Sequence, residues 1–449
     1  MVKLYNYQKP AIRGINHFNG RALIAYEMRL GKTFIALSWL KIHPYTLPAV
    51  IICPEIGKYH WEEKVKHYFE MRSVILNGTV PPKRKTIQKN KLYIINWDII
   101  QYWISFFQKA GIKTIILDES HYMKERRTQR YRAIKKISKG IPYILALSGT
   151  PLKSRPIELF TTLNLLRPDK FPSFTKFAFR YCNPKLKPWG WEFKGASHLE
   201  ELNENLRKWC MLRLLRKDAI KEPPKDRRLI TIPLTNRKEY EEAKNSFINW
   251  LSKKSISKSK KAKRAERLVQ MGYLKRLAAT LKMKNVIKWI DYWLDHNKGK
   301  IAIFAIHKDI IKQLKTKYKD QCVIVDGTVR GKKRHLAVKT FQTNKKYRIF
   351  IGNTKAAGTV IQLSEARIAI GIEFDWTPGD VTQWEDRIFN PKKNKRLKIY
   401  HLVAKNTIEH HLCEILQKKQ AILSATLDGE KEINKLNIFD QLEKKLLKG

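Results

Sequence analysis

The sequence of 449 residues predicts an α/β protein with two parallel sheets, each flanked by helices. Short apolar runs rich in Val, Ile and Leu alternate with longer stretches of helical periodicity, which is typical of parallel strands joined by helical crossovers. The alternation occurs twice, in residues 1–155 and again in residues 286–449, so we expect two copies of one architecture. A helical, basic and aromatic insertion is expected between them.

Five apolar runs mark the expected strands of the first half: 22–25, 49–53, 92–95, 114–117 and 143–147. Residues 4–18 show helical spacing before the first of these runs, and residues 34–40 begin a helix after it. A charged helix is expected after the second run. Strands that alternate with helices in this way are joined in parallel, with helices on both faces of the sheet.

A tight loop ending in Gly31-Lys32-Thr33 joins the first strand to its helix, and this pattern predicts a phosphate-binding loop. Gly31 lets the backbone approach a phosphate, Lys32 would reach the β- and γ-phosphates, and the Thr33 hydroxyl would ligate magnesium. The alternative is a solvated turn, because the usual first glycine of such a loop is absent. The residues expected to contact the phosphates are Met28, Arg29, Leu30, Gly31, Lys32 and Thr33.

Polar residues follow two later strands of this half. Asp118 and Glu119 end the fourth run, where ligands bind in open α/β sheets. Asp118 can hold magnesium, and Glu119 can orient and deprotonate an attacking water. An acidic helix N-cap is the alternative for this pair. Ser148 and Thr150 follow the fifth run and could couple the nucleotide site to a bound partner, while Gln8 could read an adenine edge or be an ordinary surface residue.

The middle of the chain differs from both halves. Residues 157–216 are helical, aromatic and basic, and residues 253–267 are dominated by Lys, Ser and Arg, as in a loop or linker. The second half has expected strands at 300–305, 322–325, 348–351, 368–372 and 398–403, and it carries Gln383 and Arg387 at the start of an expected helix. The expected units are residues 1–155, 156–225, 226–285 and 286–449.

The charge is strongly positive. Lys and Arg total 91 against 40 Asp and Glu, for a formal net charge of +51. A polyanionic partner is the first explanation, and a general lysine bias that decorates solvated faces is the alternative. We expect no membrane association, because the sequence has no lipidation motif and no apolar run that could span a bilayer. The five cysteines form no Cys-x-x-Cys pair and no signal-peptide pattern is present, which favours a reducing intracellular compartment.

The order of these motifs resembles that of superfamily 2 helicases and translocases, specifically the Swi/Snf-type ATPases. Within these it is similar to the annealing-helicase, or fork-remodelling, branch, and its compact build is similar to that of phage branch-migration helicases. The resemblance covers most of the chain. The segments that carry it are Glu27–Thr33, Asp118-Glu119-Ser120-His121, Leu147–Pro151, Ser154–Leu159, Arg180-Tyr181-Cys182, Pro188–Trp191, Met211-Leu212-Arg213, Phe304–Lys308, Val325-Asp326-Gly327, Trp376–Gly379 and Gln383–Arg387.

The resemblance implies two RecA-like lobes with ATP and Mg²⁺ in the cleft between them, and DNA lying across both. It implies a DNA-dependent ATPase that remodels duplex, forked or four-way-junction DNA in replication, recombination or repair. The expected partners are replication or recombination proteins, and the expected state is a monomer. The implied catalytic residues are Lys32, Asp118, Glu119 and Arg387, with Gly358 and Gln383 among the nucleotide contacts. The implied DNA contacts are Lys58, Trp61, Lys124, Arg155, Trp189, Trp191, His307 and Lys308.

The sequence departs from this pattern at three positions. Arg29 stands where the family usually has Gly in the phosphate loop, Val360 replaces another usual Gly, and Asn390 occupies the position of the second arginine of the last motif. That arginine normally reaches the γ-phosphate. Either Arg387 acts alone, a nearby basic residue substitutes, or hydrolysis is weak. The last case would make the chain an ATP-switched DNA clamp, and an RNA helicase is a further alternative.

Overall fold

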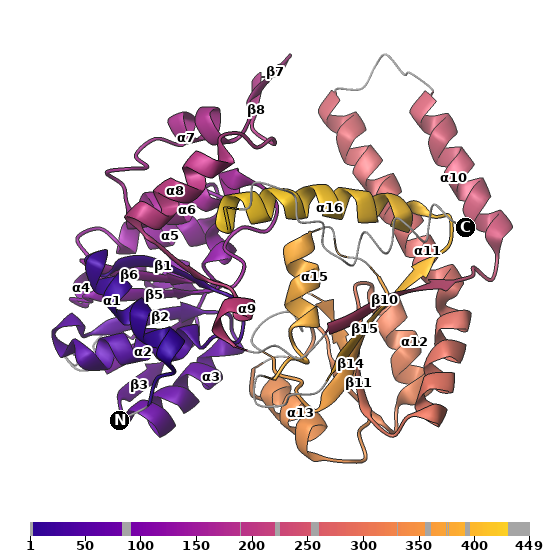
Figure 1. Ribbon diagram of the computed structural model, residues 1–449, viewed down its shortest axis with the longest axis horizontal. Coiled ribbons are helices and arrows are strands. Elements are labelled where there is room, and N and C mark those ends of the chain that lie inside the picture. Colours follow the sequence, from indigo (N-terminus) through magenta and orange to yellow (C-terminus); the bar gives the residue numbers. More distant parts are fainter. Residues whose placement is uncertain are drawn as a thin grey trace.

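Two parallel sheets, each with helices on both faces, form two RecA-like lobes that lie side by side (Figure 1). The computed structural model describes residues 3–82, 91–188, 190–220, 225–252, 260–329, 331–354, 361–373, 375, 377–390 and 396–429. Among these described residues, no helix is both long enough and apolar enough to cross a bilayer.

Lobe 1 is a seven-stranded parallel sheet in the order β3-β4-β2-β5-β6-β1-β9. Its strands are β1 (Arg21–Tyr26), β2 (Ala49–Cys53), β3 (Arg72–Ile75), β4 (Lys91–Asn96), β5 (Thr114–Asp118), β6 (Tyr143–Leu147) and β9 (Met211–Leu214). Successive residues of a strand point to opposite faces, so Ile24 joins one apolar core while Leu23 and Ala25 join the other. Both cores are buried because helices cover both faces of the sheet.

The helices of lobe 1 divide between these two cores. One face is covered by α1 (Lys9–His17), α2 (Lys32–Ile42) and α3 (Gly57–Lys64). The other is covered by α4 (Ile104–Lys109), α5 (Gln129–Ile137), α6 (Phe160–Leu166), α7 (Phe174–Tyr181) and α8 (Leu199–Trp209). Short turns of 3-10 or π type are η1 (Asn6–Gln8), η2 (Pro44–Thr46), η3 (Val65–Phe69), η4 (Ile100–Trp103), η5 (Ser120–Met123) and η6 (Pro156–Leu159).

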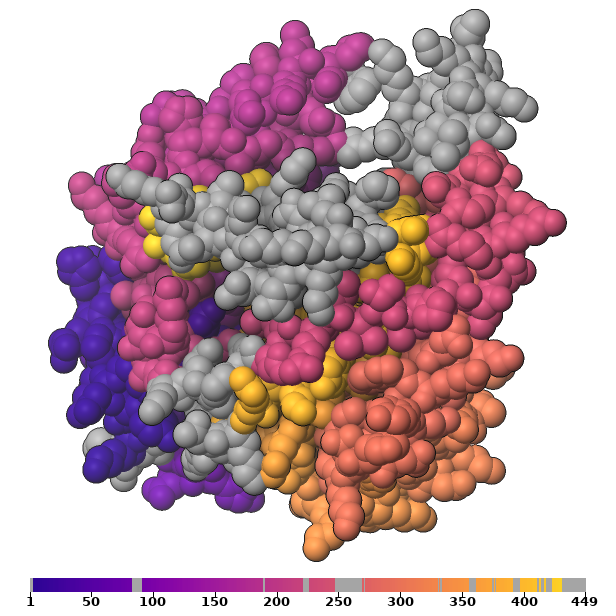
Figure 2. All heavy atoms as spheres, turned by 45° about the vertical axis from the view of Figure 1, so that its right-hand side comes forward, coloured from indigo at the N-terminus to yellow at the C-terminus, as the bar shows by residue number. Residues whose placement is uncertain are grey.

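The insertion expected at residues 156–225 is attached to lobe 1. Its helices α6 to α8 share the core of lobe 1, and β9 pairs with β1 as an edge strand of the first sheet. A two-stranded antiparallel hairpin, β7 (Lys185–Lys187) and β8 (Gly190–Glu192), extends from it. In the space-filling view the magenta insertion projects at one end of the molecule, away from the orange residues of lobe 2 (Figure 2). The four expected boundaries themselves stay a prediction.

Lobe 2 is a six-stranded parallel sheet in the order β10-β15-β14-β11-β13-β12. Its strands are β10 (Lys225–Ile232), β11 (Lys300–Ala305), β12 (Cys322–Val325), β13 (Ile349–Asn353), β14 (Ala366–Gly371) and β15 (Leu397–Ala404). Its helices are α10 (Arg237–Ser252), α11 (Lys260–His296), α12 (Lys308–Tyr318), α13 (Gly331–Thr343), α15 (Pro378–Glu385) and α16 (Ile408–Leu427), and the short α9 (Arg216–Ala219) precedes β10.

Two sequence-based expectations for this half need correction. Of the loop expected at residues 253–267, only residues 260–267 are described, and they form the first turns of α11. The motif from Gln383 to Arg387 lies at the end of α15 and not at the start of a helix, because Thr377 and Pro378 already begin that helix. The Thr377 hydroxyl accepts a hydrogen bond from the Asp380 amide, which is typical of a helix N-cap.

Helix α16 begins on lobe 2 and ends on lobe 1, passing along one side of both lobes (Figure 1). Leu423 and Leu427 belong to the apolar core of lobe 1. Asn203 Nδ2 of α8 donates to the Thr426 carbonyl at 2.9 Å. Beyond the helix, Asp428 pairs with Arg213 of β9 at 2.8 Å. The C-terminal helix therefore connects the lobes independently of the chain between them.

Candidate nucleotide site between the lobes

The phosphate loop joins β1 to α2 at the edge of lobe 1 that faces lobe 2. Gly31 has φ +78°, a conformation that favours glycine, and a Cβ placed there would lie 2.2 Å from Gln8 Nε2. Gln8 is buried, and its Nε2 donates to the Leu30 carbonyl at 3.0 Å. Gln8 thus braces the loop from behind. Its expected contact with adenine stays a prediction.

Lys32 is the first residue of α2, and its ammonium turns back over the loop. Its Nζ donates to the carbonyl oxygens of Tyr26 at 2.8 Å and Glu27 at 3.2 Å. Burial lowers the pKa of this ammonium to about 8, and the carboxylates of Glu119 and Asp118 oppose the shift. Thr33 is half-buried beside it in the first turn of the helix. The expected order of glycine, lysine and hydroxyl at a helix N-terminus is therefore present.

Asp118 and Glu119 lie at the carboxyl end of β5 and point to different partners. Trp61 Nε1 donates to Asp118 Oδ2 at 2.8 Å. Burial and then the neighbouring Glu119 charge raise the pKa of Asp118 to about 6. Glu119 has φ +53°, and its Oε2 lies 3.2 Å from His121 Nδ1. Burial opposes ionisation of Glu119, but the hydrogen bond and charge of His121 hold its pKa below the usual value.

A hydrogen-bonded chain leads from Glu119 to the loop after β6. The Ser148 hydroxyl donates to Glu119 Oε2 at 3.3 Å and accepts from the Thr150 amide at 3.2 Å. Three residues later, Lys153 Nζ pairs with Asp380 Oδ1 of lobe 2 at 2.7 Å. The two residues expected to act in coupling, Ser148 and Thr150, thus lie between the carboxylate and a contact that crosses the cleft. The sequence motifs contained no signal for Lys153 or Asp380 as a pair.

Arg387 brings lobe 2 to the phosphate loop, because Arg29 Nη2 donates to its carbonyl at 3.1 Å. Arg387 is only 5% exposed. Burial lowers the pKa of its guanidinium, and the Glu119 carboxylate opposes that shift. Within the described part of the chain, Gln383 Nε2 and Thr150 Oγ1 are buried without a hydrogen-bond partner. Gly358 and Val360 lie outside the described residues.

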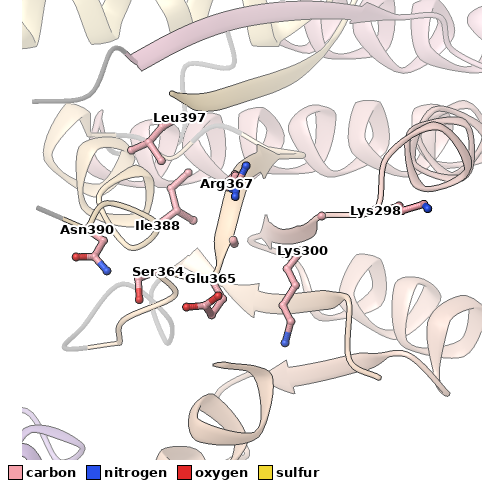
Figure 3. A pocket seen from close by; sticks show the side chains of 10 residues that line it. Lys298, Lys300, Ser364, Glu365, Arg367, Ile388, Asn390 and Leu397 are labelled. Carbon is pink, nitrogen blue, oxygen red and sulfur yellow. The ribbon is translucent and has the colours of Figure 1, made fainter. Parts of the chain in front are cut away.

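Asn390 lines a cavity of about 460 Å³ in lobe 2, together with Ser364, Ile388 and Leu397 (Figure 3). Every residue that lines the cavity belongs to lobe 2. The residue at the position of the family's second arginine thus lies at a cavity of its own lobe.

Lys64, at the end of α3, is a further cation of the site that the sequence did not suggest. Its Nζ lies 5.1 Å from the centre of the Phe34 ring. Burial lowers the pKa of Lys64 to about 8, an effect that Asp118 opposes and Arg29 strengthens. A single lysine at a helix end carries no sequence signal, because most such residues are solvated.

The donor set fits a magnesium-bound polyphosphate. Burial lowers the pKa of Arg29 to about 9 and that of Lys32 and Lys64 to about 8, so these cations lack full compensation by protein charges. A polyanion in the cleft would restore it. Asp118 and the Thr33 hydroxyl are oxygen ligands of the kind that Mg²⁺ prefers, with the remaining positions filled by water and phosphate.

Two expected DNA contacts need correction. Trp61 is 1% exposed and bonds to Asp118, so it supports the nucleotide site instead of offering a face to a base. Lys58 is also buried, and its Nζ donates to Asn77 Oδ1 at 2.6 Å and Asn96 Oδ1 at 3.1 Å. Both residues are on α3, whose position against the sheet could not be read from residue type alone.

The other expected DNA contacts stay predictions, and their side chains differ in exposure and in bonding partners. Lys308 is exposed, and His307 Nδ1 is bonded to Glu373. Lys124 pairs with Glu158 at 3.5 Å, and Arg155 is half-buried. Trp191 is 48% exposed on the β7–β8 hairpin. Trp189 lies outside the described residues.

Comparison with known proteins agrees with this arrangement. Residues 7–286 match the SNF2-related domain, and residues 281–392 match the helicase conserved C-terminal domain. One relative is the SWI/SNF-related matrix-associated actin-dependent regulator of chromatin subfamily A-like protein 1 of Xenopus laevis. The two sequences are 29% identical in an alignment that covers 98% of this chain and 45% of the relative. Another relative is the human DNA annealing helicase and endonuclease ZRANB3, which is 29% identical in an alignment that covers 96% of this chain and 41% of the relative. The chain therefore spans less than half the length of these two relatives.

A solved structure, the Sulfolobus solfataricus SWI2/SNF2 ATPase core in complex with dsDNA, aligns with 100% of this chain and 97% of its own, at 21% identity and a TM-score of 0.44. The family match rests on the sequence models, of which the first alone covers more than half of the 449 residues. The phosphate loop, the Asp118-Glu119 pair and the lobe 2 arginine all lie within the matched ranges and meet at one cleft. The chain belongs to the SNF2-related family.

Proposed function

We propose that the chain is an ATP-dependent DNA translocase or helicase that remodels branched DNA. The observation that carries the proposal is that the loop before Lys32 contacts lobe 2 at Arg387, with Arg29 Nη2 donating to the Arg387 carbonyl at 3.1 Å, while Lys32 and the Asp118-Glu119 pair lie on the lobe 1 side. Groups contributed by two lobes can act together only when the cleft is closed. Hydrolysis and relative lobe movement would then be linked.

In this proposal each residue has a distinct task. Lys32 and Arg387 stabilise negative charge that develops on the transferred phosphoryl group. Glu119, held by Ser148 and His121, orients the attacking water and accepts its proton. Asp118 and Thr33 would hold Mg²⁺, which when bound supplies charge neutralisation at the phosphates.

Branched DNA is the proposed substrate for two reasons. One relative carries the name DNA annealing helicase. In this chain, Trp191 remains half-exposed on a hairpin that also carries Lys185 and Lys187. An exposed aromatic ring beside basic residues can stack on bases where strands separate. The net charge of +51 supports a nucleic-acid partner more generally.

An ATP-switched DNA clamp with weak hydrolysis is a second candidate. It is favoured by the asparagine at position 390, where the resembling family has its second arginine. ATP turnover should be measured without nucleic acid and with single-stranded DNA, linear duplex, a fork and RNA. Strong stimulation by the fork supports the remodelling proposal. Tight DNA binding with minimal turnover on every substrate supports the clamp, and stimulation by RNA alone contradicts both.

A further inference from the structure

Arg29 occupies the tip of the phosphate loop in a strained backbone conformation. Its φ is +72°, in the left-handed region that L-residues rarely adopt and that glycine adopts freely. The sequence has arginine here despite that backbone preference. An explanation must therefore come from what the side chain contacts.

The guanidinium of Arg29 crosses the cleft to the main chain of lobe 2. Its Nη2 donates to the Arg387 carbonyl at 3.1 Å and lies 3.4 Å from the Ile361 carbonyl. Arg387, whose guanidinium is the lobe 2 charge of the site, is thus held through its backbone carbonyl by the predicted phosphate loop. The charge of Arg387 in turn acts on both Arg29 and Glu119.

Arg216 and Lys153 also join the lobes, through Asp386 at 2.9 Å and Asp380 at 2.7 Å. These two contacts end on carboxylates. The Arg29 contact differs from them because it ends on the backbone of Arg387 itself.

We propose that Arg29 is a positioning residue that fixes the main chain of Arg387 against the phosphate loop. The proposal rests on the proposed ATPase function. It assigns a role to the arginine that stands in this loop at φ +72°. Arg29 would set where the Arg387 guanidinium lies when the lobes close.

The kinetic test compares Arg29→Gly, Arg29→Lys and Arg387→Ala, alone and combined. Arg29→Gly should lower kcat by about 10- to 100-fold, the scale of a small misplacement of a catalytic group, with a change in KM for ATP of less than about threefold. Arg29→Lys retains a donor and should recover part of kcat. In an Arg387→Ala background, Arg29→Gly should cost almost nothing more, since residues that act through one another are not additive.

Two outcomes would overturn the proposal. One is an Arg29→Gly protein that turns over ATP as fast as the wild type or faster. The other is a double variant whose losses multiply, which would mean that Arg29 acts independently of Arg387. Exposed Arg72 on β3 gives the matched control, and Arg72→Ala should leave kcat unchanged.

A second measurement does not depend on turnover. Hydrogen–deuterium exchange of the nucleotide-free proteins should show faster amide exchange at residues 385–390 for Arg29→Gly than for the wild type, Arg29→Lys or Arg72→Ala, because this segment loses its contact with the phosphate loop. Glycine relieves the strained φ, so Arg29→Gly should fold, and thermal unfolding checks this. Unchanged exchange would contradict the connection between the lobes. If the wild type hydrolyses no ATP, the proposed function fails while exchange still tests Arg29.

Discussion

The ammonium of Lys153 in lobe 1 lies 2.7 Å from the carboxylate of Asp380 in lobe 2, and Lys153 stands three residues after Thr150, where the hydrogen-bonded chain from Glu119 ends. Asp380 is also bonded to Thr377, so it is fixed at the start of α15, the helix that ends just before Arg387. A displacement of the loop after β6 would therefore move Lys153 in lobe 1 and, through Asp380, the start of α15 in lobe 2.

Breaking this pair should weaken the link between DNA and hydrolysis. We expect Lys153→Ala and Asp380→Ala to reduce the ratio of DNA-stimulated to basal ATP turnover, each by about tenfold, a loss of roughly 1.4 kcal/mol of coupling. The double variant should be no worse than either single variant, because both remove one contact. Additive losses would show that the two residues act separately. Lys170→Ala, which changes an exposed lysine of lobe 1, is the control.

Lys32→Ala should abolish ATP turnover and leave DNA binding largely intact. Lys32 lies in the cleft, bonded to the phosphate loop, whereas the positive charge is spread over the chain. Turnover and fluorescence anisotropy with a labelled duplex are the two measurements. A parallel loss of DNA binding would place Lys32 in the DNA site and contradict the separation of functions.

Glu119→Gln should bind ATP but hydrolyse it at least about 100-fold more slowly, because the amide cannot accept the proton of the attacking water. Single-turnover kinetics separates binding from chemistry. Glu125→Gln is a matched control, since Glu125 is an exposed residue only a few positions away. A wild-type rate for Glu119→Gln would show that another group is the base.

Arg387→Ala should lower kcat by about 10³-fold, the scale of a lost trans-cleft arginine, with a smaller effect on ATP binding. Asn390→Ala should change kcat by less than about threefold, because Asn390 lines a cavity formed entirely by lobe 2 residues. Measurement of kcat and KM for both variants tests whether Arg387 acts without Asn390. Severe and equal losses would mean that Asn390 reaches the nucleotide in the working state.

Trp191→Ala should reduce fork processing more than duplex-stimulated ATP turnover. Its ring is half-exposed and contacts Phe179 at a centroid distance of 4.8 Å, so it offers a face for a base while contributing some packing. Its strand partner Leu186 provides the control, and Leu186→Ala should spare fork processing. A drop in melting temperature with no selective loss on forks would assign Trp191 to packing.

Much of the fold was predictable from local pattern. The expected strand at residues 49–53 coincides with β2, and those at 300–305 and 322–325 coincide with β11 and β12. Short runs of Val and Ile between helices are typical of parallel strands that are buried on both faces of a sheet. The short edge strand β3 was missed because its four residues are only partly buried, and β9 was missed because its pairing partner β1 is far away in sequence.

The site was predictable where its residues are adjacent in sequence and not where folding brings them together. Gly31-Lys32-Thr33 and Asp118-Glu119 carry their roles in their spacing. The role of Trp61 depends on the tilt of α3, which directs its indole to Asp118. The role of Arg29 depends on an atom of Arg387, 358 residues away, and no local pattern contains such a distance.

Helix α16 has a mechanical consequence. With one connection through the chain from α9 to β10 and another through the Asn203–Thr426 and Arg213–Asp428 contacts, the lobes form a closed linkage. Because the chain and α16 both join the lobes, the lobes cannot rotate apart about a single hinge unless α16 is first released from lobe 1. Truncation before Leu423 should therefore allow the lobes to rotate more freely relative to each other. The expected consequence is a change in the number of base pairs that the protein advances per ATP hydrolysed.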